Sequence, residues 1–176
     1  HLGSGKRAGR IVSADRDGVN VQRYQDPLVI QAALREPRVA VVGLSSNHLR
    51  PSNFVGFYLQ RHGYQMVPVN PRETEILGQR SYPSLSDIPE PVAVVDVFRD
   101  PSAAPDIARE AVETGARFLW LQFGVISAEA AEIAEAGGMQ VIMDRCLKIE
   151  HARDLGRMHW LRLNTGQIRA RRRQPD

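Results

Sequence analysis

Short apolar runs alternate with amphipathic stretches from about residue 26 onwards. Four stretches repeat their apolar residues at helical spacing, over about 27–36, 52–62, 103–114 and 127–136. Five short apolar runs are bounded by turn residues, as buried strands are: 39–42, 65–69, 92–97, 117–121 and 139–143. Strands that alternate with helices indicate parallel βαβ units. The pattern predicts an α/β fold, a Rossmann-like open parallel sheet of about five to six strands with helices on both faces.

Local signals set the expected ends of the helices. Asp26 followed by Pro27 is a pair that opens a helix. Ser52 or Asn53 is the expected N-cap of the second helix, which Gly63 would end. We therefore expect that the first two helices flank the first strand.

Two parts of the chain lack a clear period. Residues 72–91 are rich in Glu, Pro and Ser and should form the longer connection between the second and third strands, anchored by Tyr82 and Leu85. Beyond about residue 156 the periodicity fades, and we expect a last short strand at 160–163.

Length and composition fit one ordinary globular domain. The chain has 176 residues, of which 43% are hydrophobic and 24% charged. No apolar run approaches the roughly 20 residues that span a bilayer, and no secretory signal is recognisable. The single cysteine, Cys146, cannot form an internal disulfide. These features predict a cytoplasmic protein that does not insert into a membrane.

The positive charge lies at the two ends of the chain. The whole chain has a net charge of +3, whereas residues 1–23 carry +3 and residues 169–176 carry +3, so residues 24–168 carry −3. Basic tails are usually solvated, and the folded part shows no aromatic RNA-binding motif. The sequence therefore argues against a nucleic-acid partner.

The first residues read His1-Leu2-Gly3-Ser4-Gly5, with no initiator methionine, which is typical of a cloning remnant. We expect residues 1–23 to be this remnant and a flexible arm, 24–165 to be the folded domain, and 166–176 to be a basic C-terminal tail.

The turn after the first strand contains the first candidate site. Gly43 allows a ligand to approach the backbone, and Ser45 and Arg50 suit a phosphate beside a helix N-terminus. The segment is not a G-x-G-x-x-G motif, and an ordinary capped turn is the alternative interpretation.

The end of the second strand bears on which phosphorylated ligand would bind. Proteins that bind NAD usually place an acid here to hold the ribose hydroxyls. Here the sequence reads Val69-Asn70-Pro71-Arg72, which favours a ligand phosphorylated on its ribose. This observation alone leaves NADP open.

Four ordered motifs resemble a known family: VVGLSSNHLRPSNFVGFYLQRHGYQMVPVNP, DVFRDPS, LWLQFGV and DRCLKIEH. Together they resemble the small CoA-binding-domain proteins of the YccU group, relatives of the CoA-binding domain of the succinyl-CoA synthetase α chain. The resemblance covers about residues 26–155. It implies a site for coenzyme A (or acyl-CoA) on a Rossmann-like domain.

The resemblance also assigns roles to residues of this chain. It implies phosphate contacts from Gly43, Ser45 and Arg50, an adenosine border of Val69, Asn70, Pro71 and Arg72, further contacts from Phe98, Arg99 and Ser102, and closure of the far side by Gln122 and Gly124. Structural alternatives exist for the third group. Phe98 could simply cover the sheet, Arg99 could pair with Asp96 or Asp100, and Ser102 could cap a helix.

Cys146 and His151 suggest a thiol–imidazole pair, because a nearby histidine can activate a cysteine. The commoner arrangement is a small buried cysteine near a histidine held by Asp144 or Glu150. One hypothesis from the sequence is that Cys146 lies near the CoA thiol and forms a mixed disulfide with it under oxidation.

No complete catalytic set is visible. The sequence has no G-x-S-x-G elbow, Walker loop or cluster of metal ligands, and it is too short for the second domain of the synthetase α chain. The sequence therefore favours a non-catalytic binding or sensing module for coenzyme A or an acyl-CoA. The alternative is an NADP-type dinucleotide-binding oxidoreductase. Besides the small-molecule ligand, the partner could be a second copy in a homodimer or another protein.

Overall fold

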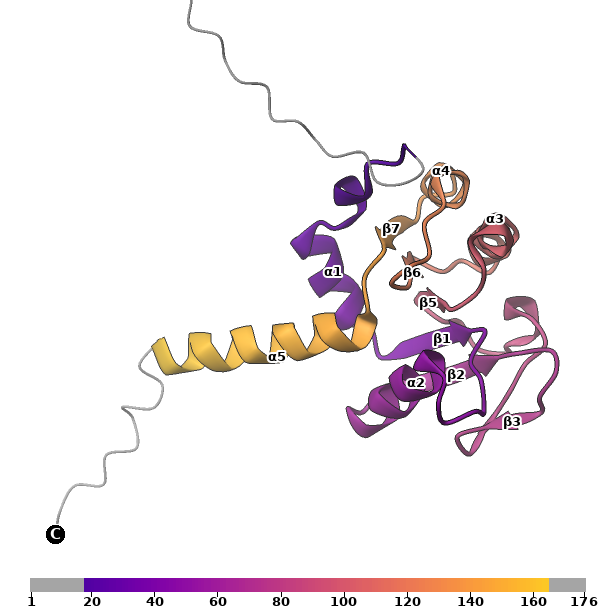
Figure 1. Ribbon diagram of the computed structural model, residues 1–176, viewed down its shortest axis with the longest axis horizontal. Coiled ribbons are helices and arrows are strands. Elements are labelled where there is room, and N and C mark those ends of the chain that lie inside the picture. The colour runs from indigo at the N-terminus through magenta and orange to yellow at the C-terminus, as the bar shows by residue number, and fades with distance from the viewer. Residues whose placement is uncertain (1–17, 165–176) are drawn as a thin grey trace, which may run out of the picture.

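A single parallel sheet forms the centre of the protein, as a computed structural model that describes residues 18–164 shows (Figure 1). The strand order is β2-β1-β5-β6-β7, and every neighbouring pair is parallel. The strands are β1 (Arg38–Val42), β2 (Gln65–Val69), β5 (Val94–Val97), β6 (Phe118–Leu121) and β7 (Gln140–Met143). The predicted Rossmann-like fold is confirmed, with five strands in this sheet.

Helices cover both faces of the sheet, as predicted. They are α1 (Pro27–Leu34), α2 (Pro51–Arg61), α3 (Ala104–Glu113), α4 (Ala128–Ala136) and α5 (Leu147–Asn164), with short 3-10 turns η1 (Val21–Tyr24), η2 (Leu85–Asp87) and η3 (Pro101–Ala103). Residues of α3 and α4 share one buried apolar cluster, and residues of α1, α2 and the start of α5 share the other. The domain is therefore three layers deep.

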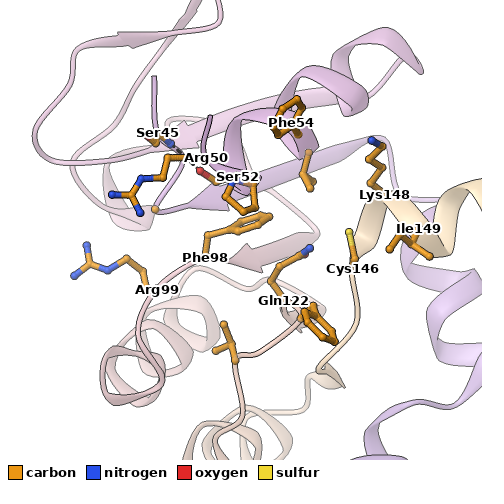
Figure 2. Close-up of a pocket in the computed structure, with 15 residues that line it drawn as sticks. Ser45, Arg50, Ser52, Phe54, Phe98, Arg99, Gln122, Cys146, Lys148 and Ile149 are labelled. Atoms are coloured by element: carbon orange, nitrogen blue, oxygen red, sulfur yellow. Dashed lines mark hydrogen bonds between the residues drawn. The ribbon is translucent and has the colours of Figure 1, made fainter. Parts of the chain in front are cut away.

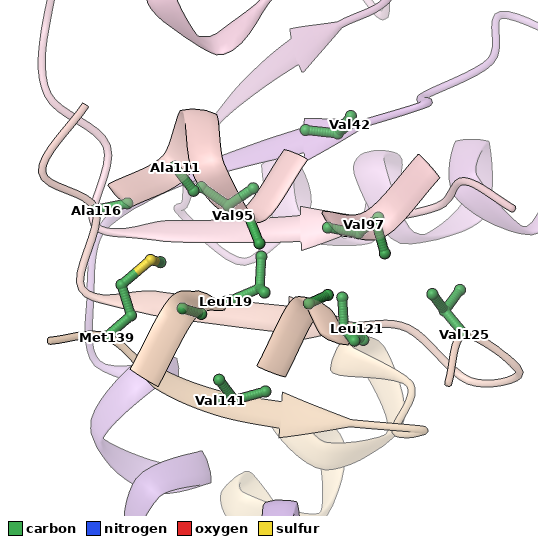
Figure 3. Packing of buried hydrophobic residues seen from close by; sticks show 14 of the residues in the cluster. Val42, Val95, Val97, Ala111, Ala116, Leu119, Leu121, Val125, Met139 and Val141 are labelled. Atoms are coloured by element: carbon green, nitrogen blue, oxygen red, sulfur yellow. The ribbon is translucent and has the colours of Figure 1, made fainter. Parts of the chain in front are cut away.

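Small residues let α3 and α4 lie close to the sheet (Figure 3). The two helices bury alanines that are completely inaccessible to solvent, at positions 104, 108, 111, 130, 131 and 134. These alanines pack against Val95, Val97, Leu119 and Leu121 of the central strands. Because alanine side chains are small, the backbones of helix and strand approach closely without leaving cavities.

Several local predictions need correction. The segment 160–163 belongs to α5 and is not a strand. Val21, within the expected N-terminal arm, is 3% exposed, so the packed region reaches back beyond residue 24. The connection 72–91 contains a small hairpin of β3 (Glu75–Ile76) and β4 (Gln79–Arg80). Its expected anchors are present, because Leu85 is buried and Tyr82 bridges to Val69. Residues 1–17 of the arm and the basic tail, 166–176, lie outside the described residues.

The strand order reverses direction at β1. The chain passes from β1 outwards to β2 and then returns to β5 on the other side of β1. The connections that leave the carboxyl ends of β1 and β5 therefore diverge, and this divergence opens a crevice between them. Ligands of open α/β sheets bind in such a crevice.

Candidate functional site

A cavity of about 840 Å³ lies at the carboxyl ends of β1, β5, β6 and β7 (Figure 2). Its lining comes from the turns after these strands and from the first turns of α2 and α5: Gly43, Ser45, Arg50, Pro51, Ser52, Phe54, Val55, Phe98, Arg99, Gln122, Phe123, Val125, Cys146, Lys148 and Ile149. The turns after β1, β5, β6 and β7 therefore meet at one site. Six of the predicted residues line it: Gly43, Ser45, Arg50, Phe98, Arg99 and Gln122.

Gly43 sits where only glycine fits. Its φ is +85°, and a Cβ atom built on it would lie 2.4 Å from the carbonyl oxygen of Phe98. A side chain would therefore be strained by the backbone conformation and would also collide with the neighbouring strand end. Gly43 lets the turns after β1 and β5 touch and fixes the floor of the cavity.

The turn after β1 is held by the start of α2. The Ser45 N–H donates to the Ser52 hydroxyl at 3.1 Å, and the Asn53 side-chain amide donates to the Ser45 carbonyl at 2.9 Å. Neither Ser52 nor Asn53 caps the helix as predicted, because Arg50 is the N-cap residue and Pro51 follows it. Arg50 makes no side-chain cap bond, so the N-terminus of α2 faces the cavity without a capping oxygen.

Two arginines give this part of the cavity its positive charge. Arg50 and Arg99 are both exposed and lie on the same side of the cavity in Figure 2. The predicted alternative in which Arg99 pairs with Asp96 is wrong, since both carboxylate oxygens of Asp96 are buried without a partner. Burial raises the pKa of Asp96 well above its usual value.

The alternative role expected for Ser102, as a helix cap, is not observed, because Ala103 is the N-cap residue of α3. Ser102 lies within η3 and donates from both its N–H and its hydroxyl to the Asp100 carboxylate. Asp100 is therefore the cap, and these hydrogen bonds lower its pKa. Ser102 lines neither this cavity nor the smaller one described next.

A smaller cavity of about 210 Å³ lies beside the first, between the end of β2 and α3. Val69 and Pro71 line it together with Arg99, which also lines the larger cavity. The two cavities therefore adjoin at Arg99. Two of the four residues predicted to border adenosine are found here.

The other two residues of this group behave differently. The side-chain amide of Asn70 donates to the Leu44 carbonyl at 2.9 Å, and its oxygen accepts from the N–H of Arg72. Asn70 thus ties the end of β2 to the turn after β1, while Arg72 lies exposed outside both cavities. Glu73, which was not among the predicted residues, also reaches this turn, because its carboxylate accepts from Ser46 N–H at 3.2 Å.

The turns after β6 and β7 are bonded to each other. Asp144 has a φ of +57°, and its carboxylate accepts from Gly124 N–H at 2.7 Å. Gly124 therefore shapes the loop and does not line the cavity. Gln122 is 4% exposed, and its side-chain oxygen accepts from Leu147 N–H at 3.4 Å. These bonds hold the loop after β6 against the start of α5.

Cys146 lines the cavity, but His151 is engaged elsewhere. The His151 imidazole shares a 2.7 Å hydrogen bond with the Tyr58 hydroxyl, and the His62 ring lies 5.1 Å away between centroids. Burial and then His62 lower the pKa of His151, while Asp154 acts in the opposite direction. The suggested thiol–imidazole pair is not formed, and neither Asp144 nor Glu150 holds the histidine.

Most of the apolar residues that line the cavity were not among the predicted ones. Phe54, Phe123 and Ile149 are half or more exposed and come from α2, the loop after β6 and α5. Lys148 lies beside them, with its ammonium 5.8 Å from the centre of the Tyr58 ring. The sequence does place large apolar residues next to the turns that line the cavity. They were not predicted because the expected position of the site rested only on polar residues and glycines that follow strands.

Residues 18–164 contain no group of three or more metal-ligating side chains. Within the same range, no helix combines the length and apolar character needed to cross a membrane.

A family comparison matches this arrangement. The sequence model described as the CoA binding domain matches residues 37–152, which contain all five strands of the sheet and all the residues that line the larger cavity. The chain belongs to the CoA binding domain family. The predicted resemblance is therefore confirmed at the level of the family.

Two individual proteins show sequence similarity to this chain. The chain is 42% identical over 118 residues to the uncharacterized protein YneT of Bacillus subtilis, covering 67% of this chain and 87% of YneT. It is 30% identical over 119 residues to acetate–CoA ligase (ADP-forming) I of Archaeoglobus fulgidus, covering 62% of this chain but only 17% of the ligase. This CoA binding domain thus resembles one segment of a much larger enzyme.

Solved structures share the fold. A hypothetical protein from Pyrococcus horikoshii OT3 superposes with a TM-score of 0.72 at 37% identity, covering 74% of this chain and 93% of that one. A Thermus thermophilus protein superposes with a TM-score of 0.69 at 36% identity, covering 73% and 98%.

Proposed function

We propose that this chain binds coenzyme A or an acyl-CoA across the two adjoining cavities, as a non-catalytic binding or sensing module. The observation that carries the proposal is the graded lining of the larger cavity. Arg50 and Arg99 lie on one side, and the walls beyond Phe98 are mainly apolar. Coenzyme A has the same polarity, with phosphates at one end and a long uncharged pantetheine arm at the other.

In this proposal the phosphates of coenzyme A bind beside Arg50 and Arg99. The uncapped N-terminus of α2 adds its own partial positive charge to that of Arg50. The smaller cavity then takes the adenosine, against Val69 and Pro71. Because Arg99 lines both cavities, it stands where phosphate groups would join the adenosine to the pantetheine arm.

The binding role without catalysis rests on the side chains around the cavity. The described lining of the larger cavity contains a cysteine and a lysine but no histidine or carboxylate to serve as a general base for them, and the acids Asp106 and Glu110 line only the smaller cavity. His151 bonds to Tyr58 instead. An NADP-type oxidoreductase is the competing function, and ligand binding separates the two.

Calorimetric titration with CoA, acetyl-CoA, NADP and NAD tests the proposal directly. We expect binding of CoA or acetyl-CoA. Tight binding of NADP without CoA binding would establish the competing function.

Arg99→Ala tests where the phosphates lie. Loss of a charge-assisted phosphate contact should weaken CoA binding by about tenfold to a hundredfold and leave binding of pantetheine, which lacks phosphate, unchanged. Arg117→Ala is the matched control, because Arg117 is an exposed arginine just before β6, at the opposite edge of the sheet and outside both cavities. Equal losses for CoA and pantetheine would refute a phosphate role for Arg99.

We also propose that the protein partner is a second copy bound along α5. The outer half of this helix extends beyond the body of the protein in Figure 1 and leaves large apolar side chains 43% to 61% exposed: Leu155, Met158, Trp160, Leu161 and Leu163. A second copy packed against the face that carries Leu155, Met158 and Leu161 would cover these three side chains from water.

A further inference from the structure

Part of the larger cavity is lined by an apolar surface that has no role in binding phosphates. Phe54, Phe123 and Ile149 are 54%, 75% and 51% exposed and line the same cavity. Exposed apolar side chains that are scattered singly are ordinary on a protein surface. Here three of them come from three separate segments of the chain and converge on one cavity, which points to an apolar occupant.

This apolar surface lies away from the arginines. In Figure 2, Arg50 and Arg99 lie on one side, Cys146, Lys148 and Ile149 lie on the other, and Phe98 and Gln122 lie between them. The same figure shows the amide nitrogen of Gln122 directed towards the space between Phe98 and Cys146. Its oxygen already accepts from Leu147 N–H, so this nitrogen is the atom that can donate to a carbonyl of the ligand.

Resting on the proposed binding of coenzyme A, we propose that the natural ligand is an acyl-CoA with an apolar acyl group. The acyl group lies against Phe54, Phe123 and Ile149 and covers them from water. A free thiol would leave this surface bare, because it ends in one small atom with no carbon chain beyond it. The thioester carbonyl lies near Gln122, which supplies the polar contact that fixes the start of the chain.

The expected gain in affinity follows from the free energy of moving methylene groups from water to an apolar surface. Each methylene that is fully buried raises affinity about fourfold, and a half-buried one about twofold. Titration with CoA, acetyl-CoA, butyryl-CoA and hexanoyl-CoA should therefore show affinity that rises about twofold to fourfold per methylene. The measured quantity is the ratio of the hexanoyl-CoA affinity to the CoA affinity.

Two variants locate the acyl group. Phe123→Ser and Ile149→Ser should each lower that ratio at least threefold. Phe57→Ser is the matched control, since Phe57 is a half-exposed phenylalanine on α2, like Phe54, but does not line the cavity. It should leave the ratio and the CoA affinity unchanged. All three side chains are half or more exposed, so their loss should not prevent folding.

The possible results separate this inference from the proposed function. Equal affinity for CoA and every acyl-CoA would overturn the acyl inference and leave CoA binding intact. Tighter binding of succinyl-CoA than of butyryl-CoA, abolished by Lys148→Met, would overturn it in favour of a charged acyl group. Failure to bind CoA or any of its thioesters would instead contradict the proposed function itself.

Discussion

Asp96 is a carboxyl group without a hydrogen-bond partner in the middle of the sheet. It lies on β5 beside Val41 and Trp120 of the neighbouring strands, and none of its surface is exposed. Both of its oxygens are unpartnered, and burial raises its pKa. An ionised carboxylate in this position would be strongly destabilising. The folded protein therefore holds a proton on Asp96 at pH values where the unfolded chain has released it.

This difference predicts a pH dependence of stability. Above the ordinary pKa the folded state binds one more proton than the unfolded state, so the free energy of unfolding falls as the pH rises towards the raised pKa, by up to about 1.4 kcal/mol per pH unit. Asp96→Asn should remove this fall. Urea unfolding of both proteins at pH 5 and pH 7.5 measures it.

Asp106→Asn serves as the control for Asp96, because Asp106 is an exposed acid of α3 paired with Arg109. It should leave the pH dependence of the free energy of unfolding as in the parent protein. If Asp96→Asn also leaves it unchanged, Asp96 does not carry the extra proton.

At the level of single residues, the sequence predicts those positions whose role is set by their immediate neighbours in the chain. Gly43 was singled out because it follows a strand, and the nearby carbonyl of Phe98 explains why a glycine is required there. Phe123 and Ile149 were not predicted, because an exposed apolar residue acquires a role only when another segment lies beside it. The role of Asp100 as the cap of η3 likewise depended on which of two nearby exposed polar side chains accepts the hydrogen bonds of the other.

At the element scale, α5 is attached to α2 by aromatic and histidine side chains. His151 on α5 bonds to Tyr58 of α2, and the rings of His62 and Tyr64 pack against it. Burial raises the pKa of Tyr58, and burial followed by Asp154 raises that of Tyr64 to about 12, so both hydroxyls stay neutral at physiological pH. Lys148 and Ile149, one turn earlier on α5, line the cavity. The contacts that hold α5 against α2 therefore also position one side of the cavity.

Acid should loosen this attachment. Because the pKa of His151 is lowered below its ordinary value of about 6.5, its contribution to stability is complete above that pH and is lost as the pH falls below it. The His62 ring, whose centroid lies 5.1 Å from that of His151, also opposes a positive charge on His151. Hydrogen exchange, corrected for intrinsic rates, should show reduced protection of the first turns of α5 at pH 5 relative to pH 7.

His151→Phe tests whether the histidine causes this loss. The variant keeps an aromatic ring but cannot take up a proton, so protection of α5 should no longer depend on pH between 5 and 7. His48→Phe is the control, because His48 is an exposed histidine in the turn after β1. Unchanged acid sensitivity in His151→Phe would show that another group is responsible.

The sequence predicted the elements whose signals are local and regular. The five strands are mainly apolar, with Asp96 in β5 as the exception inside a run, and their positions were predicted with small errors at their ends. The outer half of α5 was missed because its apolar residues fall on two sides of the helix, Met158 and Leu161 on one and Trp160 and Leu163 on the other. A helix without one buried stripe has no clear hydrophobic period.

At the scale of the whole molecule, the location of the site was predictable although the strand order was not. Pairing of β1 with both β2 and β5 depends on contacts between distant segments, which no local pattern encodes. The carboxyl ends of parallel strands nevertheless meet at one edge in any such order, so the turns could be expected to share a site. The division into two cavities needed the position of α3 as well.

The outer half of α5 leads to the last prediction, which concerns the assembly. A helical segment that extends into water is marginally stable by itself, whereas a second copy would cover Met158, Leu161 and their neighbours. Sedimentation velocity from 5 to 200 µM (about the range for moderate affinities) should show a dimer. Met158→Glu should shift the protein to monomer by placing like charges at the contact, whereas Leu28→Glu, at an exposed leucine of α1, should leave the dimer intact. A parent protein that stays monomeric throughout this range would contradict pairing along α5.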